Sequence, residues 1–515
     1  MSHASHPRRG KGLRDALRRH LLPTHHPRPA SHAYTPLRPE DMNQPSSQVT
    51  VVDGPTVPQL TPTRLEALRA RFTYEARHSP ARLAVVVFAL IIAIETALLS
   101  LPIASASERP PAFVDVLFTA TSAVCVTGLT TVDTATQWTP FGQVVIAMGI
   151  KVGGLGVMTL ASILGIAVSR HLGLTQRLLT AHETGQDDMS QLSGLLRAVI
   201  VTSSAVEVLL FLAFFPRFLL LPDHSLVDSA WQAAFMAISV ANNAGFVILV
   251  GGLGPYASDW WMLMPIIVGT VAGAVGFPVV QDVWARWRTP NKWTLHTKLT
   301  LLTYVVLAFA GSLLFALTEW TNPQSLGGLD TVSKTLNVML AGVNTRSSGL
   351  TSLDVGVMYP QTHFVQDLLM MIGGGSASTA GGIKVTTFAV LVLAVLAEAR
   401  GDQDIESFGR RIPPTAVRVA VSVTILGSAL VGVSVVLLLS MTNYSLDVIL
   451  FESVSAFATV GLSTGITASL PPMAKYTLVA LMFAGRTGSM TMAAALAIRE
   501  RSRVIRMPEE RPIIG

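Results

Sequence analysis

The sequence predicts an all-α polytopic membrane protein with four helix–pore loop–helix repeats, that is, eight transmembrane spans around a pseudo-fourfold central pore. Half of the 515 residues are hydrophobic and 13% are charged, against about a quarter charged in soluble domains. Apolar runs of membrane-spanning length recur along the chain. A short phrase ending in glycine also recurs four times, at intervals of roughly 104 to 117 residues. That period suits a helix–re-entrant loop–helix unit and is too long for a solenoid repeat.

The four phrases share their flanking residues as well as their glycines. The first, second and fourth have phenylalanine ten residues and serine six residues before the glycine, and the serines are Ser122, Ser239 and Ser455. The first and third both continue Gly-Leu-Thr-x-x-Asp, ending at Asp133 and Asp354. Four glycines in register with shared flanks indicate four equivalent units.

Residues 1–78 differ in composition from the rest of the chain. They are rich in Arg, His, Pro and Ser and contain no apolar segment of the kind a signal peptide needs. We expect a disordered basic tail on the cytoplasmic side, in which a short helix over 14–22 either touches anionic lipid or is simply solvated. The histidines in this tail lack the spacing of metal ligands. The net charge of +6 follows from this tail and from the span flanks, so it does not indicate nucleic acid.

Eight spans are expected as four pairs, each bracketing a segment too short to cross a bilayer. The expected spans are 83–102 and 141–168, 196–221 and 261–284, 299–317 and 364–396, and 417–439 and 476–498. The enclosed pore segments are 113–124, 227–241, 331–343 and 447–458. The corresponding repeats cover 79–169, 194–287, 296–399 and 415–506, before a C-terminal tail at 507–515.

The distribution of Lys and Arg predicts the orientation in the plasma membrane. One set of loops is basic, whereas the set that holds the pore segments is poor in Lys and Arg. Because short cytoplasmic loops carry an excess of positive charge, both termini should be cytoplasmic and the pore segments should open from outside. The basic set is Arg170, Arg177, Arg197, Arg286, Arg288, Lys292, Lys298, Arg400, Arg410, Arg411, Arg418, Arg499, Arg501, Arg503 and Arg506.

Four aspartates mark the beginnings of the pore segments: Asp115, Asp228, Asp330 and Asp447. Aspartate caps helix N-termini well because its carboxylate accepts hydrogen bonds from unpaired backbone N–H groups. The alternative is an outer acidic ring that concentrates cations, and the two roles can coexist.

Each glycine and the three residues before it form one of the four stretches of the predicted ion selectivity filter. They are Cys125, Val126, Thr127 and Gly128; Asn242, Asn243, Ala244 and Gly245; Arg346, Ser347, Ser348 and Gly349; and Ala458, Thr459, Val460 and Gly461. Carbonyls aimed at one axis require unusual dihedrals, which glycine adopts without steric cost. None of these residues is acidic, so selection by carbonyl dipoles favours a weakly hydrated monovalent cation over Ca²⁺ or Mg²⁺. We expect Arg346 to lie behind the filter and to donate hydrogen bonds to carbonyls there.

A polar, glycine-rich stretch interrupts the second span of the third repeat. It comprises Gly373, Gly374, Gly375, Ser376, Ala377, Ser378, Thr379, Ala380, Gly381 and Gly382, followed closely by Lys384. Five glycines in ten residues do not sustain an ordinary helix, and a break at membrane depth usually lines the path. The predicted role is a gate, and the alternative is a close helix crossing built from small residues.

The predicted spans contain a few scattered charged residues, among them Glu95, Lys151, Glu207 and Arg486. Arg486 should face the cavity near this loop, because an intramembrane arginine needs a partner or water. There it would form an electrostatic barrier or hydrogen-bond the loop. Glu95, Glu207 and Lys151 are expected to be structural, with partners that the sequence does not identify.

These motifs together resemble the superfamily of Trk, Ktr and HKT potassium transporters, most closely the KtrB-type membrane subunit. The resemblance covers about 79–506 and rests on SAVCVTGL, NNAGF, NTRSSGL, SAFATVGLSTG, GGGSASTAGGIK and GRTG. It implies K⁺ uptake through one path per subunit, without an organic cofactor, with a filter glycine in each repeat, a gating loop in the third and Arg486 as the gate arginine. It also implies a homodimer docked on a cytosolic, nucleotide-binding RCK ring.

The resemblance has two departures and leaves one alternative. The N-terminal tail is longer than usual, and Lys151 stands where the family pattern has glutamine before GGLG. The alternative is a sodium-dominated or Na⁺-coupled transporter of the same fold. The family associates sodium preference with serine at the first filter glycine, so Gly128 argues against it. A membrane-embedded enzyme is disfavoured because the spans carry only scattered charges.

Overall fold

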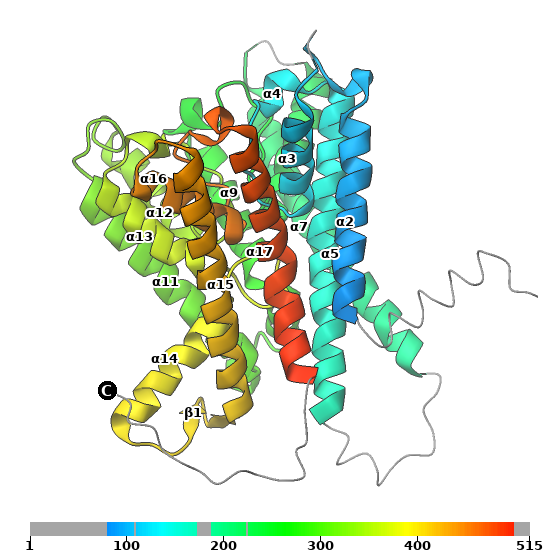
Figure 1. Ribbon diagram of the computed structural model, residues 1–515, viewed down its shortest axis with the longest axis vertical. Helices are drawn as coiled ribbons and strands as arrows, with labels where there is room; N and C mark the ends of the chain where they lie inside the picture. The colour runs from blue at the N-terminus through cyan, green and yellow to red at the C-terminus, as the bar shows by residue number, and fades with distance from the viewer. Residues whose placement is uncertain (1–79, 108–109, 173–186, 223–224, 499–515) are drawn as a thin grey trace, which may run out of the picture. The chain divides into compact units, whose positions relative to one another are not determined.

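The computed structural model describes residues 80–107, 110–172, 187–222 and 225–498, and these residues are predominantly helical (Figure 1). The predicted tails at 1–78 and 507–515 lie outside the described residues. A helix or a broken helix occupies each of the eight expected span positions. A short helix occupies each of the four expected pore segments. The observed element bounds follow, repeat by repeat.

The first repeat consists of α2 (Pro80–Leu99), α3 (Phe113–Val124), α4 (Thr134–Gln137) and α5 (Pro140–Leu172). The second consists of α7 (Asp187–Leu219), α8 (Leu226–Ala241), α9 (Trp260–Val275) and α10 (Phe277–Ala285). The third consists of α11 (Leu295–Glu319), α12 (Thr331–Asn344), α13 (Pro360–Met371) and α14 (Val385–Arg400), followed by the hairpin of β1 (Ile405–Ser407) and β2 (Arg410–Ile412). The fourth consists of α15 (Pro414–Met441), α16 (Leu446–Phe457) and α17 (Pro472–Ile498).

Helix-to-helix contacts connect the repeats in chain order and then return to the beginning. Helix α5 of the first repeat contacts α7 and α8, and α9 of the second contacts α11 and α12. Helices α13 and α14 of the third contact α16 and α15, and α17 of the fourth contacts α2 and α3. Figure 1 shows α17 between α15 and the α2–α5 pair. Each repeat therefore has a neighbouring repeat on both sides.

Three described helices are long and apolar enough to cross a membrane. They are α7 over Arg197–Leu219, α11 over Leu295–Glu319 and α15 over Pro414–Met441. Helices α9 and α10, which meet at a bend of 94°, would be a fourth if the two together form one broken span. Full crossing by all eight elements, and the fourfold pore around them, remain predictions from the sequence.

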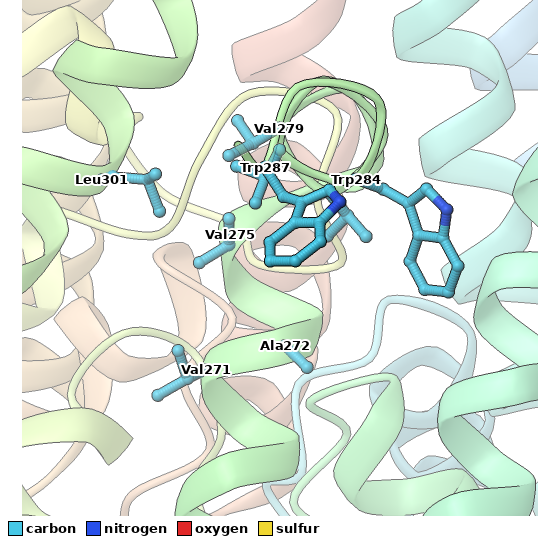
Figure 2. A pocket seen from close by; sticks show the side chains of 9 residues that line it. Val271, Ala272, Val275, Val279, Trp284, Trp287 and Leu301 are labelled. Atoms are coloured by element: carbon cyan, nitrogen blue, oxygen red, sulfur yellow. The ribbon is translucent and has the colours of Figure 1, made fainter. Parts of the chain in front are cut away.

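The bend between α9 and α10 differs from the sequence prediction of one continuous span over 261–284. The helix ends at Gly276, which has φ 95°, a backbone conformation that suits glycine. Beside the bend lies an apolar cavity of about 580 Å³. Val271 and Val275 on α9, Val279 on α10 and Trp287 beyond it line this cavity (Figure 2). The second and third repeats therefore both have an interrupted second helix.

Candidate functional site

The backbone after each pore helix repeats the same conformation. In all four repeats the glycine and the residue two positions before it have positive φ. For residues with a side chain this region costs roughly 1–2 kcal/mol. The non-glycine residues are Val126 (55°), Asn243 (55°), Ser347 (76°) and Thr459 (47°). The glycines are Gly128 (93°), Gly245 (75°), Gly349 (65°) and Gly461 (94°). The four stretches of the predicted filter are thus equivalent in conformation as well as in sequence.

Each of the four glycines lies beside the residue that precedes the next glycine, and these contacts close into a cycle. A Cβ atom added to any of them would come within 3.0 Å of the carbonyl oxygen that precedes the next glycine in the cycle. The distances are 2.6 Å from Gly128 to Ala244, 3.0 Å from Gly245 to Ser348, 2.5 Å from Gly349 to Val460 and 2.1 Å from Gly461 to Thr127. These positions therefore exclude a side chain, and backbone carbonyls of all four repeats lie close together.

The shared serines hold these stretches to their pore helices. The backbone N–H of Gly128 donates to Ser122 Oγ at 3.0 Å, and that of Gly461 donates to Ser455 Oγ at 3.1 Å. Ser239 instead donates to the carbonyl oxygen of Phe246 at 2.7 Å. In three repeats the hydroxyl of the serine six residues before the glycine thus hydrogen-bonds to the backbone, which explains why this serine recurs in the sequence.

The residue three positions before each glycine is buried and chemically different in every repeat. These residues are Cys125, Asn242, Arg346 and Ala458. The Arg346 guanidinium donates through Nη1 to the carbonyl oxygen of Ile372 at 3.2 Å and lies 5.8 Å from the Tyr304 ring centre. Arg346 is buried as expected, but the carbonyl it contacts belongs to the residue just before the glycine-rich loop.

Backbone hydrogen bonds join the two ends of the glycine-rich loop to each other and join the loop to α9. Its ends meet where Gly373 N donates to Ile383 O at 2.8 Å. Gly375 N donates to Ala274 O at 2.8 Å, where α9 approaches the bend. A Cβ added to Gly373 would lie 1.9 Å from Gly381 O. The glycines allow this close backbone packing, so the break in the helix is an ordered loop that contacts α9.

The same loop contacts the predicted filter stretches of the second, third and fourth repeats. The Asn243 amide and the Thr379 hydroxyl lie 3.1 Å apart, and Gly381 N donates to Ser347 Oγ at 3.1 Å. A Cβ added to Gly381 would lie 2.1 Å from Thr459 Oγ1. Sequence reasoning placed these residues in two separate motifs, and the fold brings the two motifs into direct contact.

Two basic side chains hold the loop through its carbonyl oxygens. Arg486 of α17 is 1% exposed and donates through Nη1 to Thr379 O. Lys384 donates to Ala380 O. The expectation that Arg486 faces the loop agrees with this placement. The fourth repeat therefore contacts the loop of the third with a buried positive charge.

The four aspartates lie in the first turns of the pore helices, but only Asp330 is the N-cap residue. Hydrogen bonds from Ser333 and Val332 hold the pKa of Asp330 below its usual value. Asp228 follows the N-cap Ser225, whose hydroxyl donates to it at 2.6 Å. Asp115 pairs with Lys475 at 2.8 Å. The capping interpretation is therefore wrong for Asp115 and Asp228, where earlier residues already begin the helix, whereas the Asp447 carboxylate accepts backbone hydrogen bonds from Asp447 and Val448 in the first turn.

Sequence reasoning missed Glu452, which lies within the fourth pore helix and is fully buried. Its carboxylate accepts hydrogen bonds from Ser463 Oγ at 2.6 Å, Thr464 N at 2.9 Å and Thr467 Oγ1 at 2.9 Å. These contacts hold the chain that leaves Gly461. An acidic residue within the apolar phrase FESVSAF was the available signal.

Lys151 and Glu207, whose partners the sequence did not identify, pair with each other. Lys151 Nζ lies 2.5 Å from Glu207 Oε1. The side chain of Glu95 is buried, and its carboxylate has no hydrogen-bond partner among the described residues.

Comparison with known proteins identifies relatives of this chain. Residues 63–505 match the family model described as TrkH, cation transport protein. The Ktr system potassium uptake protein B of Bacillus subtilis (strain 168) is 36% identical over 441 residues, which are 85% of this chain and 97% of that protein. The potassium/sodium uptake protein NtpJ of Enterococcus hirae is 32% identical over 446 residues, covering 85% and 98%.

A solved structure shows the same fold. The potassium transporter TrkH of Vibrio parahaemolyticus superposes with a TM-score of 0.60 at 16% identity, over 78% of this chain and 83% of that one. The family model covers most of the chain, and the sequence relatives align over nearly their full lengths. The chain therefore belongs to the TrkH family of cation transport proteins, and it is a transporter and not an enzyme.

Proposed function

We propose that this protein takes up potassium across the plasma membrane as the ion-translocating subunit of a Ktr/Trk-type system. The observation that carries the proposal is the closed cycle of the four glycines, in which backbone carbonyls from all four repeats lie close together. Carbonyl oxygens can replace the hydration shell of an ion, which is the basis of potassium filters. No residue of the four stretches is acidic, so a divalent cation would lack its preferred ligands.

The filter comprises residues 125–128, 242–245, 346–349 and 458–461. Its selectivity depends on the orientation of carbonyl dipoles, because backbone carbonyls of all four repeats lie close together beside the four glycines. This view is supported by the repeated positive φ values and by the serine hydroxyls that bind the backbone. A sodium-dominated transporter is the less favoured reading, since Gly128 keeps the first position free of a side chain.

The loop over 373–382 acts as the gate, in the closed position. Its support is the direct contact between the loop and three of the four filter stretches. An ion leaving the filter would meet the backbone around Thr379 and Gly381. The loop is held there by Arg486 and Lys384. Opening requires these hydrogen bonds to break, which ordinary thermal motion can accomplish because each contributes only about 0.5–3 kcal/mol.

The working transporter is a homodimer on a cytosolic RCK ring that binds nucleotide, with both termini cytoplasmic. This part of the proposal rests on the family resemblance and on the basic loops at one end of the repeats. The relatives described as protein B of a Ktr system are compatible with a multi-subunit assembly.

The direct test measures ion flux through the purified protein in proteoliposomes. We expect K⁺ uptake that is inhibited weakly by excess Na⁺ and not by Mg²⁺. Uptake of K⁺ should also restore growth of an uptake-deficient cell at low external potassium. Equal transport of K⁺ and Na⁺ by well-folded protein would contradict the proposed filter.

A further inference from the structure

An intramembrane ion pair lies directly behind one filter stretch. Lys151 on α5 and Glu207 on α7 lie 2.5 Å apart, with side chains 25% and 14% exposed. Charged groups within apolar helices are costly to insert into a membrane. Replacing such a pair with apolar residues is often neutral or stabilising. A requirement for stability therefore does not by itself account for the pair.

The carboxylate of this pair reaches a filter residue. Glu207 Oε1 accepts a hydrogen bond from Asn242 Nδ2 at 3.0 Å. Asn242 ends the pore helix α8, and its amide also donates to Ile238 O at 2.9 Å. The next residue, Asn243, has positive φ and contacts Thr379 of the loop. Lys151, Glu207 and Asn242 therefore form a chain of contacts that ends at the filter backbone.

Two glycines beside Lys151 bring α5 against the same part of the filter. A Cβ added to Gly154 would lie 2.2 Å from Asn242 Oδ1, and one added to Gly153 would lie 1.9 Å from Val124 O. Helix α5 thus contacts the end of the first pore helix and the Asn242 side chain in consecutive residues. The KVGGLG sequence combines this close approach with the charge that pairs with Glu207, so the lysine has a defined position relative to the filter.

The corresponding residues of the other repeats lack such a connection. Cys125 and Ala458 have no side-chain amide, and Arg346 contacts Ile372 O and the Tyr304 ring. Among the described residues, Asn242 of the second repeat is the only one of these four that hydrogen-bonds to a member of an ion pair. The filter therefore has one stretch whose backbone depends on a pair of charges from two other helices.

We infer that Lys151 and Glu207 are positioning residues that set the ion selectivity of the second filter stretch through Asn242. Lys151 orients the Glu207 carboxylate, and the carboxylate holds the Asn242 amide and with it the backbone at 242–245. This inference rests on the proposed function, because it concerns the selectivity of the same filter. It assigns to the lysine at 151 a role in ion selectivity rather than in folding alone.

The central experiment removes the pair without leaving an unpaired charge. Lys151→Met alone leaves the largely buried Glu207 carboxylate without its cation, which should lower folded yield. The double variant K151M/E207M should recover that yield, because no charge remains. Its K⁺/Na⁺ selectivity in proteoliposomes should nevertheless fall by about threefold to tenfold, because the Asn242 amide has lost its charged acceptor. A purely structural pair would recover both properties together.

A conservative variant and a matched control sharpen this test. Glu207→Gln retains an oxygen that can accept from Asn242, so its selectivity should lie between those of the wild type and K151M/E207M. The control is Arg217→Met, since Arg217 pairs with Asp259 at 2.6 Å with similar exposures of 22% and 15%. That pair lies at the beginning of α9 and contacts no filter residue in the described structure. Arg217→Met should lower yield without changing selectivity.

Coupling to the filter is tested by combining Glu207→Met with Asn242→Ala. If Glu207 acts through Asn242, the double variant should be no less selective than Asn242→Ala alone, because effects on one chain of contacts are not additive. Additive losses, or wild-type selectivity in folded K151M/E207M, would overturn the inference. If the wild-type protein itself does not prefer K⁺, the proposed function fails instead, so the two failures are distinguishable.

Discussion

At the scale of single residues, the proposed filter depends on positions that exclude a side chain. Gly128 has φ 93°, and a Cβ there would lie 2.6 Å from Ala244 O. Val126, two residues earlier, also has a positive φ of 55° although it carries a side chain, so the unusual backbone conformation extends beyond the glycine. Small changes at the glycine should therefore alter the geometry of the cycle before they alter the fold.

Gly128→Ser should weaken discrimination of K⁺ over Na⁺ while leaving folded protein. The hydroxymethyl group must displace the backbone of the second repeat, because the contact at 2.6 Å is with a carbonyl oxygen. We expect a loss of selectivity of about tenfold, which corresponds to about 1.4 kcal/mol, because the displaced carbonyl belongs to the cycle around the four glycines. Competition of Na⁺ with K⁺ uptake in proteoliposomes measures this change.

The matched control is Gly252→Ser. Gly252 also has a positive φ of 64°, but a Cβ there would have no atom within 4 Å. The control should show similar backbone strain and unchanged selectivity. An unchanged K⁺/Na⁺ ratio in Gly128→Ser, with normal yield, would rule out Gly128 as a filter residue.

At the scale of elements, the loop over 373–382 connects the second, third and fourth repeats. It is ordered by the carbonyls at the α9–α10 bend, by Ser347 and by Arg486. Its ends meet at the Gly373–Ile383 hydrogen bond, so α13 and α14 are already adjacent there. A shorter loop can therefore connect the two helices without moving either of them far.

Shortening this loop should raise K⁺ flux, or make it independent of a partner ring, while K⁺ selectivity persists. The reason is that the filter stretches belong to other segments and keep their own hydrogen bonds to Ser122 and Ser455. Flux and selectivity are measured separately in proteoliposomes, with folded yield as the control. Loss of flux at normal yield would contradict the gate, and loss of flux and yield together would support a packing role.

Arg486→Gln should act in the same direction as the loop deletion. The change removes a buried charge and weakens the hydrogen bond to Thr379 O, so the loop is held less firmly. Because both changes relieve one barrier, the flux of the double variant should be less than the product of the two separate increases. Independent, strictly multiplicative increases would show that Arg486 and the loop act on different steps.

At the scale of the whole transporter, contacts connect the four repeats in a closed order, from the first to the fourth and back. The cycle of glycines has the same order. A movement of one repeat must therefore be accommodated by both of its neighbours. We expect regulation by a cytosolic partner to reach the loop through α14, which begins at Val385, three residues after Gly382.

The basic loops should bind a ring of RCK subunits. We expect a co-expressed ring to co-purify with this protein and to change its K⁺ flux when nucleotide is added. Reversing the charges of Arg410 and Arg411, which are exposed in the β1–β2 hairpin, should weaken that association while leaving flux without the ring unchanged. Full nucleotide regulation of the purified protein by itself would refute a separate regulatory ring.

The amino-acid sequence by itself determined the repeats, the pore-helix positions and the four glycines. These depend on local requirements, namely apolar length, amphipathic short segments and backbone conformations that only glycine adopts easily. The glycine-rich interruption of a span and an arginine within another span likewise indicated the loop and Arg486, and the family resemblance implied their role as a gate. The tertiary structure decided the pairing of Lys151 with Glu207, the 94° bend at Gly276 and the carbonyls that Arg346 and Arg486 contact. Each of these depends on which distant segments meet, and an isolated charge in an apolar helix indicates that a partner is needed without identifying it.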